Sequence, residues 1–373
     1  MKTKIVLGCL LGFVASTAIA DGRIEMTSSQ AATYYKYCTR RWTTCHDPSV
    51  VWDATTENYY IFGSHLAQAA TPDLQNWTTF RAPWGVVAAD GTIRSGVSNA
   101  ETFVTNHTKS VKKGGKDISF GNFNVYDWVS AYGEGYRIDG NLWAPDVIYN
   151  ETMDKWCMYM SLNGPYHNSV IVLLTSDKVD GTYIYQGPVV YTGFKKGADE
   201  RISWKKTDLE LVLGEQKTLP ARYEHPNDWG DYWANGIDPC VFYDEEGRLW
   251  MSYGSWSGGI WMLQLDETTG LRNYDVTYRS DYDALKKGVT QDAYFGKRIA
   301  GAGCNHQNVK QLPGPDGLCL DNGMDGFCFT DFFRQFGLLR GFPETGIQRI
   351  SCFREDGCHR IIPAQQFHNG KYI

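Results

Sequence analysis

Beyond its first twenty residues, the sequence lacks any apolar run approaching the roughly 18 to 20 residues that a membrane-spanning helix needs. It also lacks a block of Lys or Arg, and its 36 basic and 42 acidic residues leave it mildly acidic. These absences argue against a membrane span and against nucleic acid or an anionic membrane as partner. No strong amphipathic helical pattern separates the β-rich runs, which favours an all-β fold.

The N-terminus has the composition of an export signal. Two lysines precede an apolar run from Ile5 to Val14, and the small residues Ala18 and Ala20 follow it. This order of charge, apolar core and small residues is typical of a secretory signal peptide. We therefore expect residues 1–20 to be removed and the mature protein to be secreted or periplasmic.

The ten cysteines are not distributed like a disulfide framework, although exported chains commonly carry one. Five of them lie between Cys304 and Cys358, and Cys157 and Cys240 stand inside apolar runs, where a buried, unpaired cysteine is expected. Cys38 and its neighbour seven residues on, Cys45, form either a local bridge or two thiols.

Three stretches of the chain follow the same pattern. In each, a carboxylate beside a proline opens a β-rich run, a polar turn follows, and a second β-rich run completes a hairpin. The paired runs are Asp47–Trp52 with Tyr59–Ser64, Ala144–Tyr149 with Trp156–Ser161, and Asp238–Tyr243 with Leu249–Ser255. Outer strands are expected within residues 69–77, 170–183 and 257–266. Repeated four-stranded units of this kind are typical of a β-propeller.

In a propeller the innermost strands of all blades begin near one end of the central channel. Asp47, Asp146 and Asp238 stand at such strand starts, so we expect their carboxylates to converge on one pocket. The alternative is that Asp and Pro merely begin strands, which both residues do readily. Three copies, each followed by the same hairpin, favour convergence.

Carboxylates facing one another across a small pocket suit glycoside hydrolysis. An inverting enzyme uses one carboxylate to activate water and a protonated one, roughly 6.5 to 9.5 Å away, to protonate the leaving oxygen. A third carboxylate raises the pKa of the acid by like-charge repulsion. The 13 Trp and 23 Tyr suit either stacking on sugar rings or an aromatic β core.

Several segments together resemble glycoside hydrolase family 43, and within it the secreted endo-α-1,5-L-arabinanases. The resemblance extends from about residue 44 to residue 301, in the order of the family. The segments that carry it are His46–Ser49, Phe62–His65, Asn141–Val147, Asn235–Pro239, Tyr253–Ile260 and Tyr294–Gly301.

The resemblance implies a five-bladed β-propeller that cleaves arabinan with inversion. About three blades are recognisable here, within a domain of residues 21–301. Asp47 matches the general base of the family, and Asp238 matches the carboxylate that tunes the acid and orients the sugar.

Five further positions match segments that line the substrate cleft. The two tryptophans also suit a place in the blade core, and the histidine either positions the base or packs beneath it. These residues are His46, Trp143, Asp146, Ser255 and Trp256.

The resemblance ends at residue 301, before the segments in which the family carries its general acid and a calcium-binding His. Glu344 and Glu355, the only glutamates in residues 302–373, lack the flanking residues of the acid, and His306 and His359 do not match the calcium ligand. The general acid and any metal ligand are therefore unassigned. The implied calcium would be structural, and the chemistry itself requires no cofactor.

Residues 302–373 have an atypical composition that three accounts fit: a natural variant with a rebuilt end, a fragment with a foreign end, or a translation that slips frame near residue 302. A one-base shift of the possible codons for residues 345–353 permits a segment like one in a later blade of the family, which favours the slipped frame. We expect this tail not to fold as blades.

The sequence thus predicts a secreted, monomeric glycosidase acting on arabinan, a side chain of plant cell-wall pectin. One alternative is an exo-acting α-L-arabinofuranosidase or β-xylosidase of the same family. Another is an arabinan-binding propeller without catalysis, since the general acid is missing.

Overall fold

The computed structural model describes residues 43–165, 167–196, 203–225, 233–255, 258–280 and 291–300, and four short strands near the C-terminus. The predicted signal peptide, Cys38 and Trp256 lie outside the described residues, as does most of the predicted tail. In the described part, no helix is both long and apolar enough to cross a membrane.

The first sheet is an antiparallel meander of four strands. It comprises β1 (Ser49–Asp53), β2 (Asn58–Phe62), β3 (Gln68–Thr71) and β4 (Thr78–Thr79), in that order. The polar turn between β1 and β2 is closed by Asp53, whose carboxylate accepts hydrogen bonds from the backbone of Thr55 and Thr56. This turn sets the register in which Ser49 pairs with Phe62.

The second sheet contains another four-stranded meander and is the most deeply buried. Its strands are β9 (Leu142–Asn150), β10 (Lys155–Leu162), β11 (Val170–Ser176) and β12 (Tyr183–Tyr191). A further hairpin, β5 (Trp84–Val87) and β6 (Ile93–Ser95), extends it, with β5 parallel to β12. Both faces of β11 and β12 are buried, so their residues form nearly continuous apolar runs.

The third sheet has five strands. The hairpin of β13 (Cys240–Tyr243) and β14 (Leu249–Ser255) continues into β15 (Gly259–Gln264), followed by β17 (Gly296–Ala300) and, outermost, β16 (Gln291–Asp292). The turn between β13 and β14 is held by Asp244, whose carboxylate accepts from the backbone N–H groups of Glu246 and Arg248.

Helices are few and short among the described residues. They are α3 (Asn99–Thr102), α4 (Val125–Ser130) and α5 (Leu209–Leu213), with 3₁₀ turns η1 (Ser64–Leu66), η2 (Ile138–Asn141) and η4 (Trp204–Lys206). The hairpin of β7 (Ser110–Lys113) and β8 (Lys116–Ser119) stands apart from the three sheets. The C-terminal strands form two hairpins, β18 (Ile350–Glu355) with β19 (Cys358–Pro363) and β20 (Phe367–His368) with β21 (Lys371–Tyr372).

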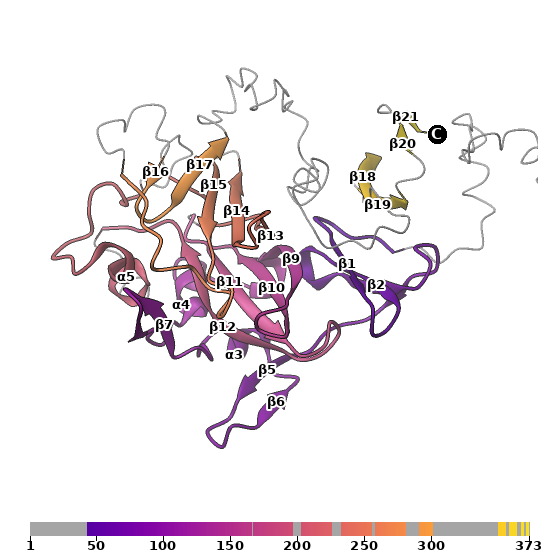
Figure 1. Cartoon of the computed structure of the whole chain (residues 1–373), viewed down its shortest axis with the longest axis horizontal. Helices are drawn as coiled ribbons and strands as arrows, with labels where there is room; N and C mark the ends of the chain where they lie inside the picture. Colours follow the sequence, from indigo (N-terminus) through magenta and orange to yellow (C-terminus); the bar gives the residue numbers. More distant parts are fainter. Residues whose placement is uncertain are drawn as a thin grey trace, which may run out of the picture.

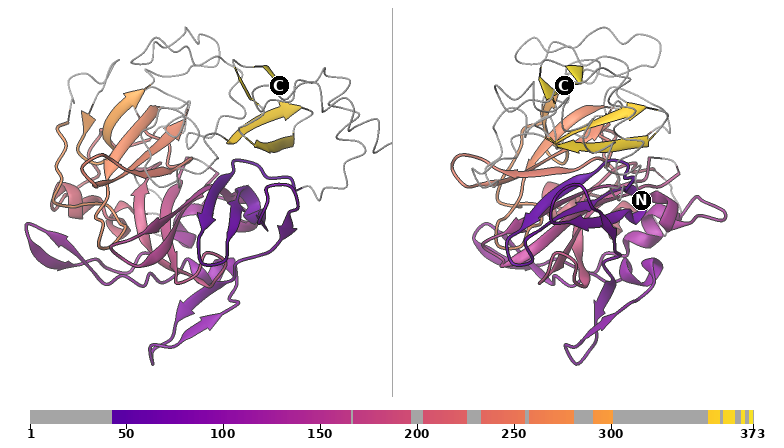
Figure 2. Two further views of the ribbon diagram at one scale, coloured as in Figure 1. Left: turned by 45° about the vertical axis from the view of Figure 1, so that its right-hand side comes forward. Right: turned by 90° about the vertical axis from the view of Figure 1, so that its right-hand side faces the viewer.

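The three sheets succeed one another as blades of a propeller (Figure 1). The first strands of neighbouring sheets lie side by side, β1 against β9 and β9 against β13, and the sheets fan out from these strands (Figure 2). One apolar core joins them, including Phe62 from the first sheet, Leu162 from the second and Leu263 from the third. The predicted all-β class and the three recognisable blades are thus confirmed.

Candidate active site

At the first strand of each of the three blades, the residue before the proline has the same unusual backbone. Asp47, Ala144 and Asp238 each precede a proline, and their φ angles are 49°, 39° and 54°. Positive φ is uncommon for residues other than glycine, and such a conformation costs on the order of 1–3 kcal/mol. The shared strain identifies these residues as the equivalent positions of the three blades.

This equivalence corrects the prediction for Asp146. The second repeat reads Pro-Asp where the other two read Asp-Pro, so Ala144 occupies the position before the proline, inside β9, and Asp146 follows two residues later. There it is level with Ser49 and Cys240, and it is only 1% exposed. Asp146 is therefore buried rather than open to a cleft, and of the three predicted carboxylates only Asp47 and Asp238 occupy the position before the proline.

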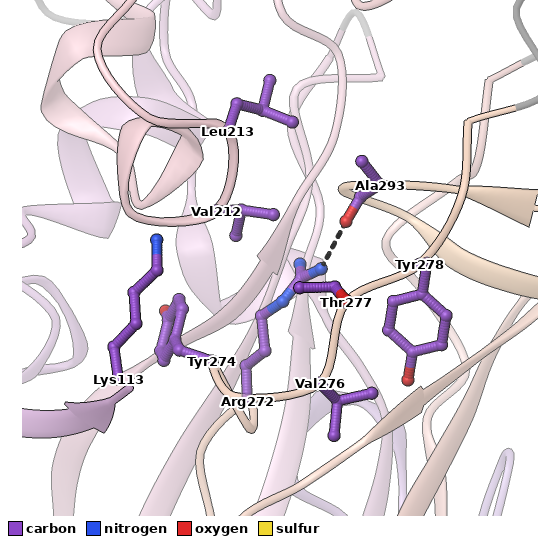
Figure 3. A pocket seen from close by; sticks show the side chains of 9 residues that line it. All are labelled: Lys113, Val212, Leu213, Arg272, Tyr274, Val276, Thr277, Tyr278 and Ala293. Atoms are coloured by element: carbon purple, nitrogen blue, oxygen red, sulfur yellow. Dashed lines mark hydrogen bonds between the residues drawn. The ribbon is translucent and has the colours of Figure 1, made fainter. Parts of the chain in front are cut away.

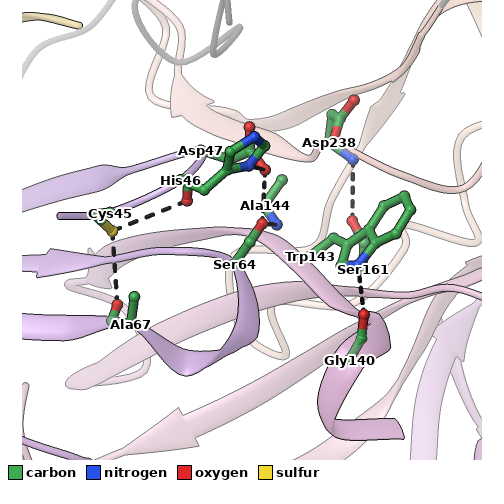
Figure 4. A network of polar contacts seen from close by, with 10 residues as sticks. All are labelled: Cys45, His46, Asp47, Ser64, Ala67, Gly140, Trp143, Ala144, Ser161 and Asp238. Atoms are coloured by element: carbon green, nitrogen blue, oxygen red, sulfur yellow. Dashed lines mark hydrogen bonds and ion pairs between the residues drawn. The ribbon is translucent and has the colours of Figure 1, made fainter. Parts of the chain in front are cut away.

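Asp47 is half-buried and held through one carboxylate oxygen (Figure 4). Its Oδ2 accepts a hydrogen bond from Ser64 Oγ at 2.7 Å and lies 2.5 Å from His46 Nδ1. Ser64 Oγ in turn accepts from the backbone N–H of Ala144 at 2.8 Å, which directs the serine proton toward Asp47. Within the described residues, no group hydrogen-bonds the other oxygen, Oδ1.

Asp238 is half-buried at the start of the third blade, and its environment disfavours its charge. Its backbone N–H donates to Ser161 Oγ at 3.0 Å. Burial, and then the negative charge of Asp47, raise the pKa of Asp238 to about 7. The two carboxylates are therefore within electrostatic reach of one another, and near neutral pH Asp238 is protonated in a large fraction of molecules.

Trp143 presents an exposed indole next to this pair. Its side chain is 37% exposed, and Nε1 donates to the carbonyl of Gly140 at 3.0 Å. The exposure argues against a place in the blade core. His46 is also exposed and lies beside Asp47 rather than beneath it.

Of the predicted residues Ser255 and Trp256, the structure describes only the backbone of Ser255. Ser255 ends β14, where its backbone pairs with Gly259. Its side chain and the whole of Trp256 lie outside the described residues.

Two serines that hold the site were not predicted. Each lies near the end of the second strand of its blade and accepts from the N–H of the residue before the proline in the next blade: Ser64 from Ala144, and Ser161 from Asp238. The signal was present in the sequence, because all three second runs end in serine, the third in Ser255.

A cluster of basic and aromatic side chains also escaped prediction. The rings of His167 and His225 stack at 4.7 Å, and Lys195 lies 4.7 Å from the ring of Tyr132. Burial, and then the positive charges of His167 and Lys195, lower the pKa of His225 to about 3. Isolated histidines and lysines carry no pattern from which such a cluster follows.

A cavity of about 260 Å³ lies elsewhere, between α5, β7 and residues 272–278 (Figure 3). Its walls include Val212, Tyr274 and Tyr278, and the buried Arg272 donates to the carbonyl of Ala293 at 3.0 Å. It shares no residue with the Asp47 and Asp238 cluster, so it is not the predicted site.

The three cysteines of the described sheets and their flanking turns are buried. Cys45 is a buried free thiol, so it does not form the local bridge, and Cys157 and Cys240 are buried as predicted. Over the described ranges, no three His, Cys, Asp or Glu side chains are grouped to hold a metal ion.

No family model matches the sequence. Curated relatives do: an extracellular endo-α-(1→5)-L-arabinanase of Thermotoga petrophila is 28% identical over 233 residues, 62% of this chain and 38% of the relative. Extracellular endo-α-(1→5)-L-arabinanase 2 of Bacillus subtilis is 25% identical over 225 residues, 60% of this chain and 36% of the relative.

Among solved structures, a family 43 glycoside hydrolase of Bacillus licheniformis is 26% identical, with a TM-score of 0.40, over 71% of this chain and 43% of that one. The predicted resemblance to glycoside hydrolase family 43, and within it to endo-arabinanases, is confirmed by the curated relatives. The chain spans less than half the length of these relatives.

Proposed function

We propose that this chain is part of a secreted glycoside hydrolase that cleaves α-1,5-linked L-arabinan in the interior of the polymer, with inversion. The observation that carries the proposal is the pair of Asp47 and Asp238, two neighbouring carboxylates whose surroundings differ. Arabinan is the polymer in the names of the curated relatives. We further propose that the protein acts as a monomer and that the chemistry needs no cofactor.

Asp47 is suited to act as the general base. Ser64 and His46 hold Oδ2, which fixes the plane of the carboxylate and leaves Oδ1 to accept a proton from water. Asp238, with its raised pKa, is suited to donate a hydrogen bond to the substrate when protonated. Trp143 offers an exposed indole face on which a sugar ring can stack.

The general acid is not assigned to any residue. Its contribution is typically about 10²- to 10⁴-fold in rate, so slow turnover by this chain is compatible with the proposal.

Incubation of the purified protein with debranched arabinan, followed by chromatography of the released sugars, tests the proposal. We expect short arabino-oligosaccharides from the wild-type protein and none from Asp47→Asn. Asp117→Asn is the matched control, because Asp117 is an exposed carboxylate of the separate β7–β8 hairpin. Equal release by wild type and Asp47→Asn would show that Asp47 is not the base.

The same experiment separates the alternatives. Release of monosaccharide alone would identify an exo-acting arabinofuranosidase, and release of xylose from xylo-oligosaccharides a β-xylosidase. Saturable arabinan binding without turnover would identify a binding propeller, which the unassigned acid favours. In either case Trp143→Ala is expected to weaken binding by on the order of 1 kcal/mol or more.

A further inference from the structure

Asp146 connects all three blades at their innermost strands. It lies on β9, and its Oδ1 accepts a hydrogen bond from Ser49 Oγ on β1 at 2.8 Å. Its Oδ2 accepts from the backbone N–H of Val241 on β13 at 2.6 Å. A single carboxylate, 1% exposed, thus bridges the two neighbouring blades from the blade between them.

The direction of these hydrogen bonds is fixed. Ser49 Oγ accepts from the backbone N–H of Val147 at 3.1 Å, so its own proton is directed to Asp146. A backbone N–H such as that of Val241 can only donate. Both partners therefore require an acceptor at Asp146, and an amide side chain supplies only one.

The two bridged positions stand close to the candidate catalytic carboxylates. Ser49 follows Asp47 by two residues, and Val241 follows Asp238 by three. Because these short segments are extended and begin with a strained residue and a proline, they have little freedom to absorb a displacement. A shift of Ser49 relative to Val241 is therefore passed on to Asp47 and Asp238.

We propose that Asp146 is a positioning residue, which sets the separation of Asp47 and Asp238 by joining β1 and β13 through β9. Burying a carboxylate costs free energy unless its hydrogen bonds are satisfied. An apolar residue would fill the same space at a lower free-energy cost, so the two hydrogen bonds of Asp146 are the reason for a carboxylate here. The effect of this positioning on turnover rests on the proposed function, whereas the separation of Asp47 and Asp238 does not.

The test compares Asp146→Asn with Ser49→Ala, which removes one bridge without changing the charge. Ser176→Ala is the control, because Ser176 is a buried serine of the same sheet, outside the bridge. The titration of Asp238 is followed by carboxyl ¹³C NMR and assigned with Asp238→Asn.

In both bridge variants we expect the midpoint of the Asp238 titration to fall by about half a pH unit or more. The reason is that Asp238 is then less buried and lies farther from the charge of Asp47, the two causes that raise its pKa. In an active wild-type background we expect kcat to fall about 10- to 100-fold with KM nearly unchanged. Ser176→Ala is expected to change neither.

If Ser49→Ala and Asp146→Asn lowered thermal stability but left the Asp238 midpoint unchanged, Asp146 would be merely structural and the proposal would be wrong. Ser49→Ala decides alone if Asp146→Asn does not fold. If the wild-type protein had no activity, the proposed function would fail, and the NMR midpoint would still decide on Asp146.

Discussion

At the scale of single residues, Asp238 is held where its charge is disfavoured. Its pKa in the folded protein is raised to about 7 by burial and then by Asp47, whereas an unfolded chain has an Asp pKa of about 3.9. Between these values the folded state binds more protons than the unfolded state, so this residue lowers stability as pH rises through that window. Such a cost is expected at a functional site rather than in a purely structural turn.

Asp238→Asn removes this cost, because an amide does not titrate. We expect the variant to be more stable than wild type at pH 8, by up to a few kcal/mol, and about equally stable near pH 4. Urea unfolding at the two pH values measures the difference.

Asp244→Asn is a control for which the pH dependence of stability has the opposite sign. Burial opposes ionisation of Asp244, but hydrogen bonds from Arg248 and Trp250 together lower its pKa. Its stabilising effect is therefore present at neutral pH and lost as pH falls. A pH-independent difference between wild type and Asp238→Asn would contradict the raised pKa.

Ser64 is the second residue whose contacts make a definite prediction. Ser64→Ala removes the donor to Asp47 and leaves the N–H of Ala144 without its acceptor. We expect a loss of about 1–3 kcal/mol in unfolding free energy, since an unsatisfied buried group costs that much. Ser110→Ala, at an exposed serine, should stay close to wild type in the same urea titration. A loss as small as that of Ser110→Ala would mean that Ser64 does not form its hydrogen bonds with Asp47 and Ala144 in the folded protein.

At the scale of elements, the hairpins could be predicted because their signals are local. Alternating apolar runs and Asp-rich turns determine the pairs β1–β2, β9–β10 and β13–β14, and all three were predicted within a few residues. The order of Asp and Pro decides whether the carboxylate stands before the proline or after it. In the second repeat the order is reversed, so Asp146 does not occupy the position of Asp47 and Asp238. The serine links cross between blades, so no single repeat reveals them.

The connection after β2 is fixed by close packing at Gly63. A Cβ added there would lie 2.1 Å from Cys45 Sγ and 2.6 Å from the carbonyl of His46. We expect Gly63→Ala to lower stability by about 1–3 kcal/mol or more and to displace the segment that carries His46 and Asp47. Gly140→Ala is the control, because its Cβ would meet open space.

A double-mutant cycle identifies the clashing atom. In a Cys45→Ala background the Sγ contact is absent, so Gly63→Ala should cost about 1 kcal/mol less than in wild type. The carbonyl of His46 remains close, so the rescue is expected to be partial. Strictly additive losses would show that the two residues do not contact one another.

At the scale of the whole molecule, the three blades share one core and one polar bridge. The class of fold and the number of blades could be predicted, because both follow from repetition along the chain. The contacts between blades could not, since the packing of sheet on sheet is decided by side chains far apart in sequence, such as Phe62 and Tyr183 with their rings 6.4 Å apart. The candidate pair Asp47 and Asp238 lies at such a junction, so the site depends on blades docking correctly.

A shared core predicts that the blades unfold together. Phe62 in the first blade and Leu263 in the third are both fully buried in the common core, and truncating either to alanine should cost about 2–5 kcal/mol. If the blades form one cooperative unit, each substitution lowers the urea midpoint of the single transition seen by circular dichroism and by tryptophan fluorescence. Hydrogen exchange should then accelerate in β2 and β14 alike, whichever blade is changed. If Phe62→Ala instead produced a separate early transition confined to β1–β4, the first blade would be an independent unit, and Asp47 could leave Asp238 without global unfolding.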